Sequence, residues 1–382
     1  SDGEEILTYG TNPKNADQDS DGMQDGWEIA NFGSLSQSPA ITASGTIQAA
    51  IDSAANDSIV LVPAGTYKGT GNKNLDFHGK RITLISASGP ENAVIDCENI
   101  DRGFYFHSEE SSASIVNGFT IQNGSTNEGA GFYILGSSPT IRNCVITGNR
   151  ATSNGGAFSA NANFYLHHWS GGSPGSGDPI FWSIGSSPII EDCRIEGNYA
   201  VSDGAAIYLS DTHPEILSSV ITERYVRGSP RISRCRIYGN EAQGSSTVYA
   251  GNNAEAMLEN CAITGNKCPG LVNSLACVTA RNCTIGENRY SSSGAGVSAV
   301  HAGTYPGFTR LQNTIVWGNE PADHQIYAPV DNALCTVDYT CHNGSYPLIG
   351  GFQINYLSLG SGNITDDPLL CRNGDINMTS PV

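Results

Sequence analysis

A short phrase that recurs along the chain constrains its fold more than any other feature. In each clear copy a Cys is followed two residues later by Ile, and an Asn stands three residues after that Ile. The clear copies occupy residues 142–149, 191–198, 233–240, 259–266 and 281–288. A repeat of roughly 20–30 residues built around one strand predicts a solenoid. Because side chains alternate across a strand, Cys and Ile should face inward, and the Gly-Asn or Glu-Asn pair should turn the chain.

Weaker copies extend the pattern to residues 115–123, 216–224 and 311–319. Ser219 and Asn313 take the Cys place in the last two. Counted from Cys144, the steps along this place are 49, 26, 16, 26, 22 and 30 residues. Coils that stack at about 4.8 Å would therefore form ladders of Cys, Ile and Asn. The steps of 49 and 16 residues are irregular.

These phrases resemble the right-handed parallel β-helix repeats of the pectate-lyase-like superfamily and of bacterial polymorphic outer-membrane adhesins. The adhesin-like part is the Gly-Gly-Ala-Phe of residues 155–158, with relatives at 129–132, 204–207 and 294–297. The resemblance implies an all-β solenoid over residues 45–320. Residues 46–55 have apolar positions at helical spacing and resemble the N-terminal capping helix of that superfamily. Residues 321–382 resemble its C-terminal closing segment. The superfamily holds lyases, hydrolases and adhesins, so the resemblance indicates fold rather than function.

Residues 17–28 match the twelve-residue calcium loop D-x-D-x-D-G-x5-E. Ca²⁺ prefers six or more hard oxygen ligands. The predicted ligands are Asp17, Asp19, Asp21, the carbonyl of Met23, Asp25 and Glu28. Residues 2–5 match the end of a similar loop, which leads us to expect further sequence upstream. Residues 1–38 resemble bacterial thrombospondin type 3 repeats, which implies a calcium-stiffened neck; the alternative is a solvated acidic linker.

The formal charge of −18 argues against nucleic acid or an anionic membrane as a partner, since both require a basic face. No apolar run is long enough to cross a membrane. An acidic excess fits a secreted protein that binds calcium or whose charge keeps it in solution. We therefore expect an extracellular or cell-surface protein of bacterial type.

The chain has eleven Cys, and five of them occupy the inward place of the clear copies. We expect these five to be packed thiols that act as small apolar residues. The pairs Cys268/Cys277 and Cys335/Cys341 lie outside this ladder and are the better disulfide candidates.

The first break in the rhythm is an insert at residues 161–184, which holds two of the four Trp. Insertions in a solenoid map to loops on one face, often the binding face. The candidate binding residues are His167, His168, Trp169 and Trp182. Exposed rings would stack on sugars; the alternative is that they fold the loop back onto the coil wall.

The second break covers residues 211–236, where five of the fourteen Arg lie within 13 residues. The weak catalytic candidates are Arg194, Asp211, His213 and Arg236. If this coil stacks next to the one with the insert, Arg194 and Arg236 would point outward near each other. They would then either hold an acidic sugar or pair with glutamates of adjacent coils.

Two functions remain open. The first is a scaffold or adhesin that binds polysaccharide or copies of itself. The second is a lyase or hydrolase that acts on an acidic polysaccharide along the outer wall. None of the compact catalytic phrases of familiar β-helix enzymes occurs in the sequence, which favours the scaffold.

Overall fold

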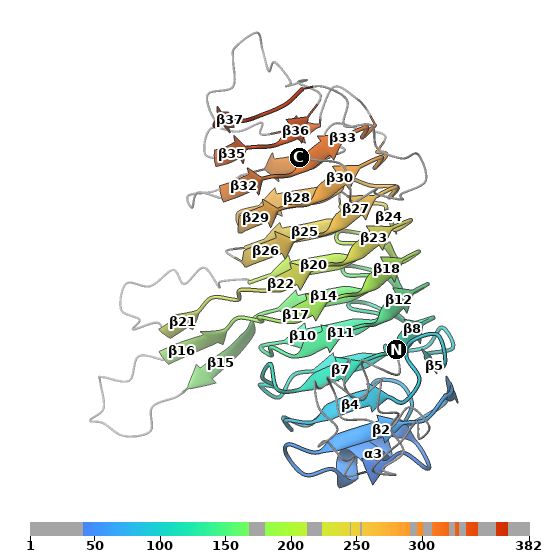
Figure 1. Ribbon diagram of the computed structural model, residues 1–382. Helices are drawn as coiled ribbons and strands as arrows, with labels where there is room; N and C mark the ends of the chain where they lie inside the picture. Colours follow the sequence, from blue (N-terminus) through green and yellow to red (C-terminus); the bar gives the residue numbers. More distant parts are fainter. Residues whose placement is uncertain are drawn as a thin grey trace, which may run out of the picture.

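The described part of the chain is a stack of coils whose strands lie one above another along a single axis (Figure 1). The structure is a computed structural model. It describes residues 41–167, 180–211, 224–244, 246–252, 254–290, 296–300, 308–320, 325–327, 334–342 and 357–365. The predicted all-β parallel solenoid is confirmed, because strand pairs between consecutive coils are parallel, as in β11–β17 and β12–β18.

Within these residues the longest stack, sheet A, has twelve strands. In stacking order they are β1 (Ile41–Thr42), β2 (Ile59–Val62), β4 (Thr83–Ser86), β7 (Ile115–Asn117), β11 (Thr140–Arg142), β17 (Ile189–Glu191), β22 (Arg231–Ser233), β26 (Glu255–Glu259), β29 (Cys277–Arg281), β32 (Phe308–Gln312), β35 (Leu334–Asp338) and β37 (Leu357–Leu359). The stacking therefore continues past residue 320.

Sheet B forms the next wall of each coil. Its strands are β3 (Gly65–Tyr67), β5 (Ala93–Asp96), β8 (Thr120–Gln122), β12 (Val145–Thr147), β18 (Arg194–Glu196), β23 (Arg236–Tyr238), β27 (Ala262–Thr264), β30 (Thr284–Gly286), β33 (Ile315–Trp317) and β36 (Cys341–His342).

Two further sheets complete the coil. Sheet C contains β6 (Phe104–Phe106), β10 (Phe132–Leu135), β14 (Phe158–Asn161), β20 (Ile207–Ser210), β25 (Val248–Gly251), β28 (Leu271–Ser274), β31 (Val297–Val300) and β34 (Ile326–Tyr327). The short sheet D, in the turn between B and C, contains β9 (Ser125–Thr126), β13 (Arg150–Ala151), β19 (Tyr199–Ala200) and β24 (Glu241–Ala242).

The core is built from ladders of like residues, as the repeated phrase predicts. Strand register places the phrase isoleucines directly above one another, for example Ile146, Ile195 and Ile237, and all three are fully buried. Phe104, Phe132 and Phe158 stack in the same way on sheet C. Burying branched and aromatic side chains in register both excludes water and fixes which residues face inward.

The phrase asparagines form a buried hydrogen-bonded ladder. In each step, Nδ2 donates to Oδ1 of the asparagine on the next coil, at 2.8–3.1 Å. The series runs Asn149, Asn198, Asn240, Asn266, Asn288 and Asn319, and ends at Oε1 of Gln325. The same Nδ2 of Asn240 also donates to the Ile195 carbonyl on the preceding coil. Buried polar groups are thereby satisfied at every turn.

The five phrase cysteines are buried and free, as predicted. Each Sγ lies within hydrogen-bonding distance of the carbonyl two residues earlier, as in Cys193 to Glu191 at 3.2 Å. Burial raises the pKa of Cys193 well above its ordinary value. One assignment was wrong: β33 pairs with β30 in a register that puts Thr314, and not Asn313, above Cys283.

The predicted disulfides were also wrong, since none of Cys268, Cys277, Cys335 and Cys341 is in a disulfide bond. Cys268 is buried among small residues of the turn, including Ala151, Ala200 and Ala242. Cys277 begins β29 on sheet A. Cys335 and Cys341 lie on different walls, in β35 and β36.

The copy predicted at residues 216–224 is not a coil of the stack. β17 pairs directly with β22, and β18 with β23, so Cys193 and Cys235 belong to consecutive coils. The steps of 26 and 16 residues are therefore one coil with an insertion. Two neighbouring coils thus carry the two breaks in the repeat.

The helix expected near residue 46 is present as α3 (Ile47–Ser53), capped by Thr46 Oγ1, which accepts from Ala49 N. Ile47 and Ile51 are fully buried in the main core. That this helix closes the stack stays a prediction, as does the calcium neck, because residues 1–40 lie outside the described part. In the residues that are described, no helix is both long and apolar enough to span a bilayer.

Candidate functional site

The two breaks in the repeat meet in one small sheet outside the stack. It consists of β15 (Asn163–His167), β16 (Ile180–Ile184) and β21 (Arg224–Val226). β15 and β16 are antiparallel, and β16 pairs in parallel with β21, so that Trp182 is the register partner of Arg224. Figure 1 shows these strands leaning away from the stack. The described strands of the insert therefore do not fold back against the coil wall.

The base of this projecting sheet is held by Asp211, which directly follows β20. Its side chain is 2% exposed, and Oδ2 accepts a hydrogen bond from Gly228 N at 2.8 Å. Gly185 and Gly228 approach so closely that neither position has room for a Cβ. Asp211, a catalytic candidate from the sequence, thus ties the two ends of the 212–227 excursion together.

Arg194 and Arg236 are register partners on β18 and β23, as expected from the sequence. Arg194 pairs with Glu91 through Nη2 at 3.4 Å and with Glu196 through Nε at 3.3 Å. Arg236 is exposed. Tyr238, further along β23, is 39% exposed and donates a hydrogen bond to Glu196 Oε2.

Arg234 lies at the corner between sheets A and B, where its φ of 52° is unusual for a residue with a side chain. Its guanidinium contacts both carboxylate oxygens of Asp192 at 2.7 Å and Glu191 Oε2 at 2.9 Å. Hydrogen bonds to these carboxylates, Asp192 first, raise the pKa of Arg234. This arginine therefore serves as a clamp between two coils.

The arginine pair and the insert do not share a groove. Arg194 and Arg236 lie on sheet B, whereas the excursions leave the coil between the end of sheet C and the start of sheet A. In Figure 1 the projecting sheet and the sheet B strands lie on opposite edges of the stack.

Several predicted site residues fall outside what the structure describes. His213, His168 and Trp169 do so, as do the calcium-loop residues 17–28. His167 ends β15, and its backbone pairs with Ile180. Among the described residues, no group of three or more His, Cys, Asp or Glu is arranged to hold a metal ion.

A column of aromatic side chains on the outer face of sheet C was not anticipated. Tyr105 stacks on His107 with centroids 4.0 Å apart and on Tyr133 at 5.4 Å, and the Arg102 guanidinium lies over both tyrosines. Tyr208 stacks on Tyr249, and burial raises the pKa of Tyr208 to about 12. The ring faces are thus used for contacts between coils. The signal in the sequence was a Tyr directly after an inward Phe, Ile or Val, as at residues 105, 133, 208 and 249.

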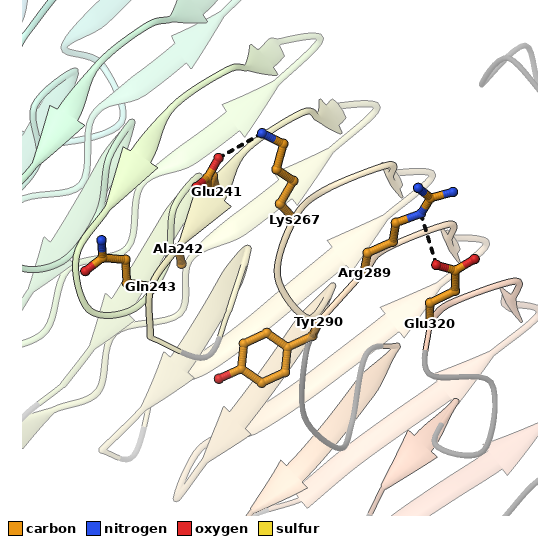
Figure 2. A pocket seen from close by; sticks show the side chains of 7 residues that line it. All are labelled: Glu241, Ala242, Gln243, Lys267, Arg289, Tyr290 and Glu320. Atoms are coloured by element: carbon orange, nitrogen blue, oxygen red, sulfur yellow. Dashed lines mark hydrogen bonds and ion pairs between the residues drawn. The ribbon is translucent and has the colours of Figure 1, made fainter.

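A notch in the turn between sheets B and C was also missed (Figure 2). It has a volume of about 620 Å³ and is lined by Glu241, Ala242, Gln243, Lys267, Arg289, Tyr290 and Glu320. Four residues lie between the ladder Asn and the next sheet C strand in the turn 266–271, against seven in the turn 240–248 and eight in the turn 288–297, so one short turn lies between two longer ones. Lys267 pairs with Glu241 at 3.0 Å, and Arg289 with Glu320 at 3.2 Å. The sequence signal was the 22-residue step from Cys261 to Cys283.

The chain is similar to one family model and to several solved structures. A family model described as the right handed beta helix region matches residues 68–229. No curated protein matches the chain. The solved structure of pectate lyase Pel9A is 15% identical, with 86% of this chain and 78% of that chain covered and a TM-score of 0.41. The A-module of Azotobacter vinelandii mannuronan C-5 epimerase AlgE6 is also 15% identical, with coverages of 89% and 99% and a TM-score of 0.42. A rhamnogalacturonan lyase is 10% identical, with coverages of 80% and 74% and a TM-score of 0.37.

The chain is thus a right-handed parallel β-helix with two insertions that pair outside the stack. Identities of 10–15% leave its activity open, since one fold supports many functions.

Proposed function

We propose that the chain is an extracellular or cell-surface scaffold of adhesin type, in which the β-helix is a rigid shaft and the sheet β15–β16–β21 is the contact surface. The observation that carries this proposal is the meeting of both insertions in one sheet that projects from the stack. Insertions on one face of a solenoid are where binding surfaces occur. The expected partner is a polysaccharide, contacted by His167, His168, Trp169 and Trp182, or a second copy of the chain.

The arginines of the wall give a second support. Arg194 and Arg234 make ion pairs with Glu91, Glu196, Asp192 and Glu191, so their charges are engaged in holding coils together. In the same proposal, Ca²⁺ bound by the loop at residues 17–28 stiffens the segment before the shaft.

The test is retention of the full chain in gels that contain neutral or acidic polysaccharides, together with assays for unsaturated uronate and for new reducing ends. Retention without product is the expected result. Trp169→Ala with Trp182→Ala should abolish retention, whereas Trp317→Ala, on the sheet B wall, should not. Retention that survives the double substitution would contradict the proposed surface. Product that disappears in Arg236→Met would instead establish the lyase or hydrolase alternative.

A further inference from the structure

We infer that the notch at Lys267 and Arg289 binds a small organic anion, with its charged group between these two cations and its ring on Tyr290. The notch opens from the turn between sheets B and C, so this inference does not depend on the projecting sheet or on its partner.

The charges around the notch follow from the ladder. The residues directly after four successive ladder asparagines are Glu241, Lys267, Arg289 and Glu320, so the order along the stack is acid, base, base, acid. Lys267 N donates to the Asn240 carbonyl at 2.9 Å, and Arg289 N donates to the Asn266 carbonyl at 2.8 Å. The two cations therefore start from neighbouring coils, about 4.8 Å apart at the backbone.

Each cation is paired with the glutamate on its outer side, away from the other cation (Figure 2). The side chains of Lys267 and Arg289 are 71% and 72% exposed. Ion pairs this exposed are weak, so an incoming anion loses little when it displaces a glutamate. An anion between the two cations would also relieve their mutual repulsion and accept charge-assisted hydrogen bonds from both.

The opposite side of the notch suits a ring. Tyr290 is half-buried, and its backbone N donates to the Glu320 carbonyl at 2.8 Å, which fixes its position. Figure 2 shows the Tyr290 ring pointing away from the Arg289 guanidinium, toward the side of the notch where Gln243 lies. The volume of about 620 Å³ lies in the range of small-molecule sites, roughly 300–1,000 Å³. The chemistry points to a carboxylate, sulfonate or phosphate carried on a ring.

The experiment titrates the full chain with benzoate, benzenesulfonate and phenyl phosphate and measures Kd by ligand-observed NMR. Acetate supplies the charge without the ring, and benzyl alcohol the ring without the charge. We expect at least one ring anion to bind with Kd of about 1 mM or tighter, and both controls to bind at least about fivefold more weakly. Comparison of the three Kd values shows whether the notch prefers a carboxylate, a sulfonate or a phosphate.

Variants locate the binding. Lys267→Met and Arg289→Met should each weaken the preferred ring anion about tenfold. Arg81→Met is the matched control, because Arg81 is an exposed arginine paired with Asp57 on another part of the surface. Glu241→Gln should tighten binding, since it removes the competing carboxylate, and a folding defect would not do so. Absence of saturable binding, or equal affinity in Lys267→Met and the native chain, overturns the inference.

Discussion

The side-chain amide of Asn198 donates a hydrogen bond to Oδ1 of Asn240 at 3.1 Å and joins two coils across 42 residues of sequence. The backbone N of Asn198 donates to the same oxygen at 3.0 Å. One side-chain oxygen thus satisfies two buried donors of the preceding coil.

Asn240→Ala should destabilise the chain by about 2–4 kcal/mol, because the Asn198 donors and the Ile195 carbonyl lose their partner in the interior. Denaturant unfolding followed by circular dichroism measures the loss. Asn92→Ala is the control, since the Asn92 side chain makes one exposed hydrogen bond, to the Ser88 carbonyl, and its loss should change stability by less than about 0.5 kcal/mol. If both substitutions lowered the free energy of unfolding equally, the buried ladder would contribute no more to stability than an exposed hydrogen bond.

The ladder thiols should resist alkylation in the native chain. Cys144, Cys193, Cys235, Cys261 and Cys283 are 1–3% exposed, whereas Cys277 is half-buried. Reaction requires an accessible thiolate, and burial both blocks access and raises the pKa of Cys193. Iodoacetamide labelling followed by peptide mass spectrometry should modify Cys277 well before the five ladder residues. Ladder peptides labelled as fast as the Cys277 peptide would contradict the packed-thiol interpretation.

Asp96 should make the fold sensitive to acid. Burial alone would raise its pKa, but hydrogen bonds from Asn123 Nδ2 and Glu98 N, with Lys68 nearby, lower the pKa from 3.8 to about 2. A lowered folded-state pKa gives stability that is present above pH 3.8 and is lost as the pH falls toward 2. Asp96→Asn should therefore be less stable than the native chain at pH 6, and this difference should shrink between pH 4 and 2. Thermal unfolding at a series of pH values checks it; a difference that stays constant would be the contrary result.

Calcium should bind the complete loop at residues 17–28 and depend on its last residue. Glu28→Gln removes a bidentate carboxylate and should weaken Ca²⁺ binding by at least roughly tenfold, as measured by calorimetry on chelator-treated full chain. Glu5→Gln is the matched control, because Glu5 takes the same place in an incomplete loop. Similar effects of the two substitutions would argue for a diffuse acidic linker.

The inward ladders could be predicted because they depend on local alternation within one strand. Ile146, Ile195 and Ile237 each occupy the same place of the same phrase, and the stack simply superimposes them. That Arg194 and Arg236 are adjacent could be predicted only if their two coils were assumed to be neighbours in the stack.

The errors concern relations between coils, which a local phrase does not contain. Residues 216–224 carry Ile and Ser at suitable spacing, yet β17 pairs past them with β22. The notch forms because one turn is shorter than the next. It therefore cannot be predicted from any one copy of the phrase, only from a comparison of neighbouring coils. Trp182 lies in the first break of the repeat and Arg224 in the second, but their pairing could be predicted only by knowing that the two excursions leave the stack side by side.

The hydrogen bonds between the side chains of the asparagine ladder all run in one direction along the stack. Each side-chain amide from Asn149 to Asn319 donates from Nδ2 to the side-chain oxygen of the next ladder residue, and the second Nδ2 hydrogen bond goes to an isoleucine carbonyl of the preceding coil. The bonds between ladder side chains therefore form one continuous chain along the axis, and hydrogen bonds in such chains polarise one another. The two ends of the ladder are therefore unlike: at one end Asn149 Oδ1 accepts from Gly124 N, and at the other Gln325 Oε1 accepts from Asn319 Nδ2.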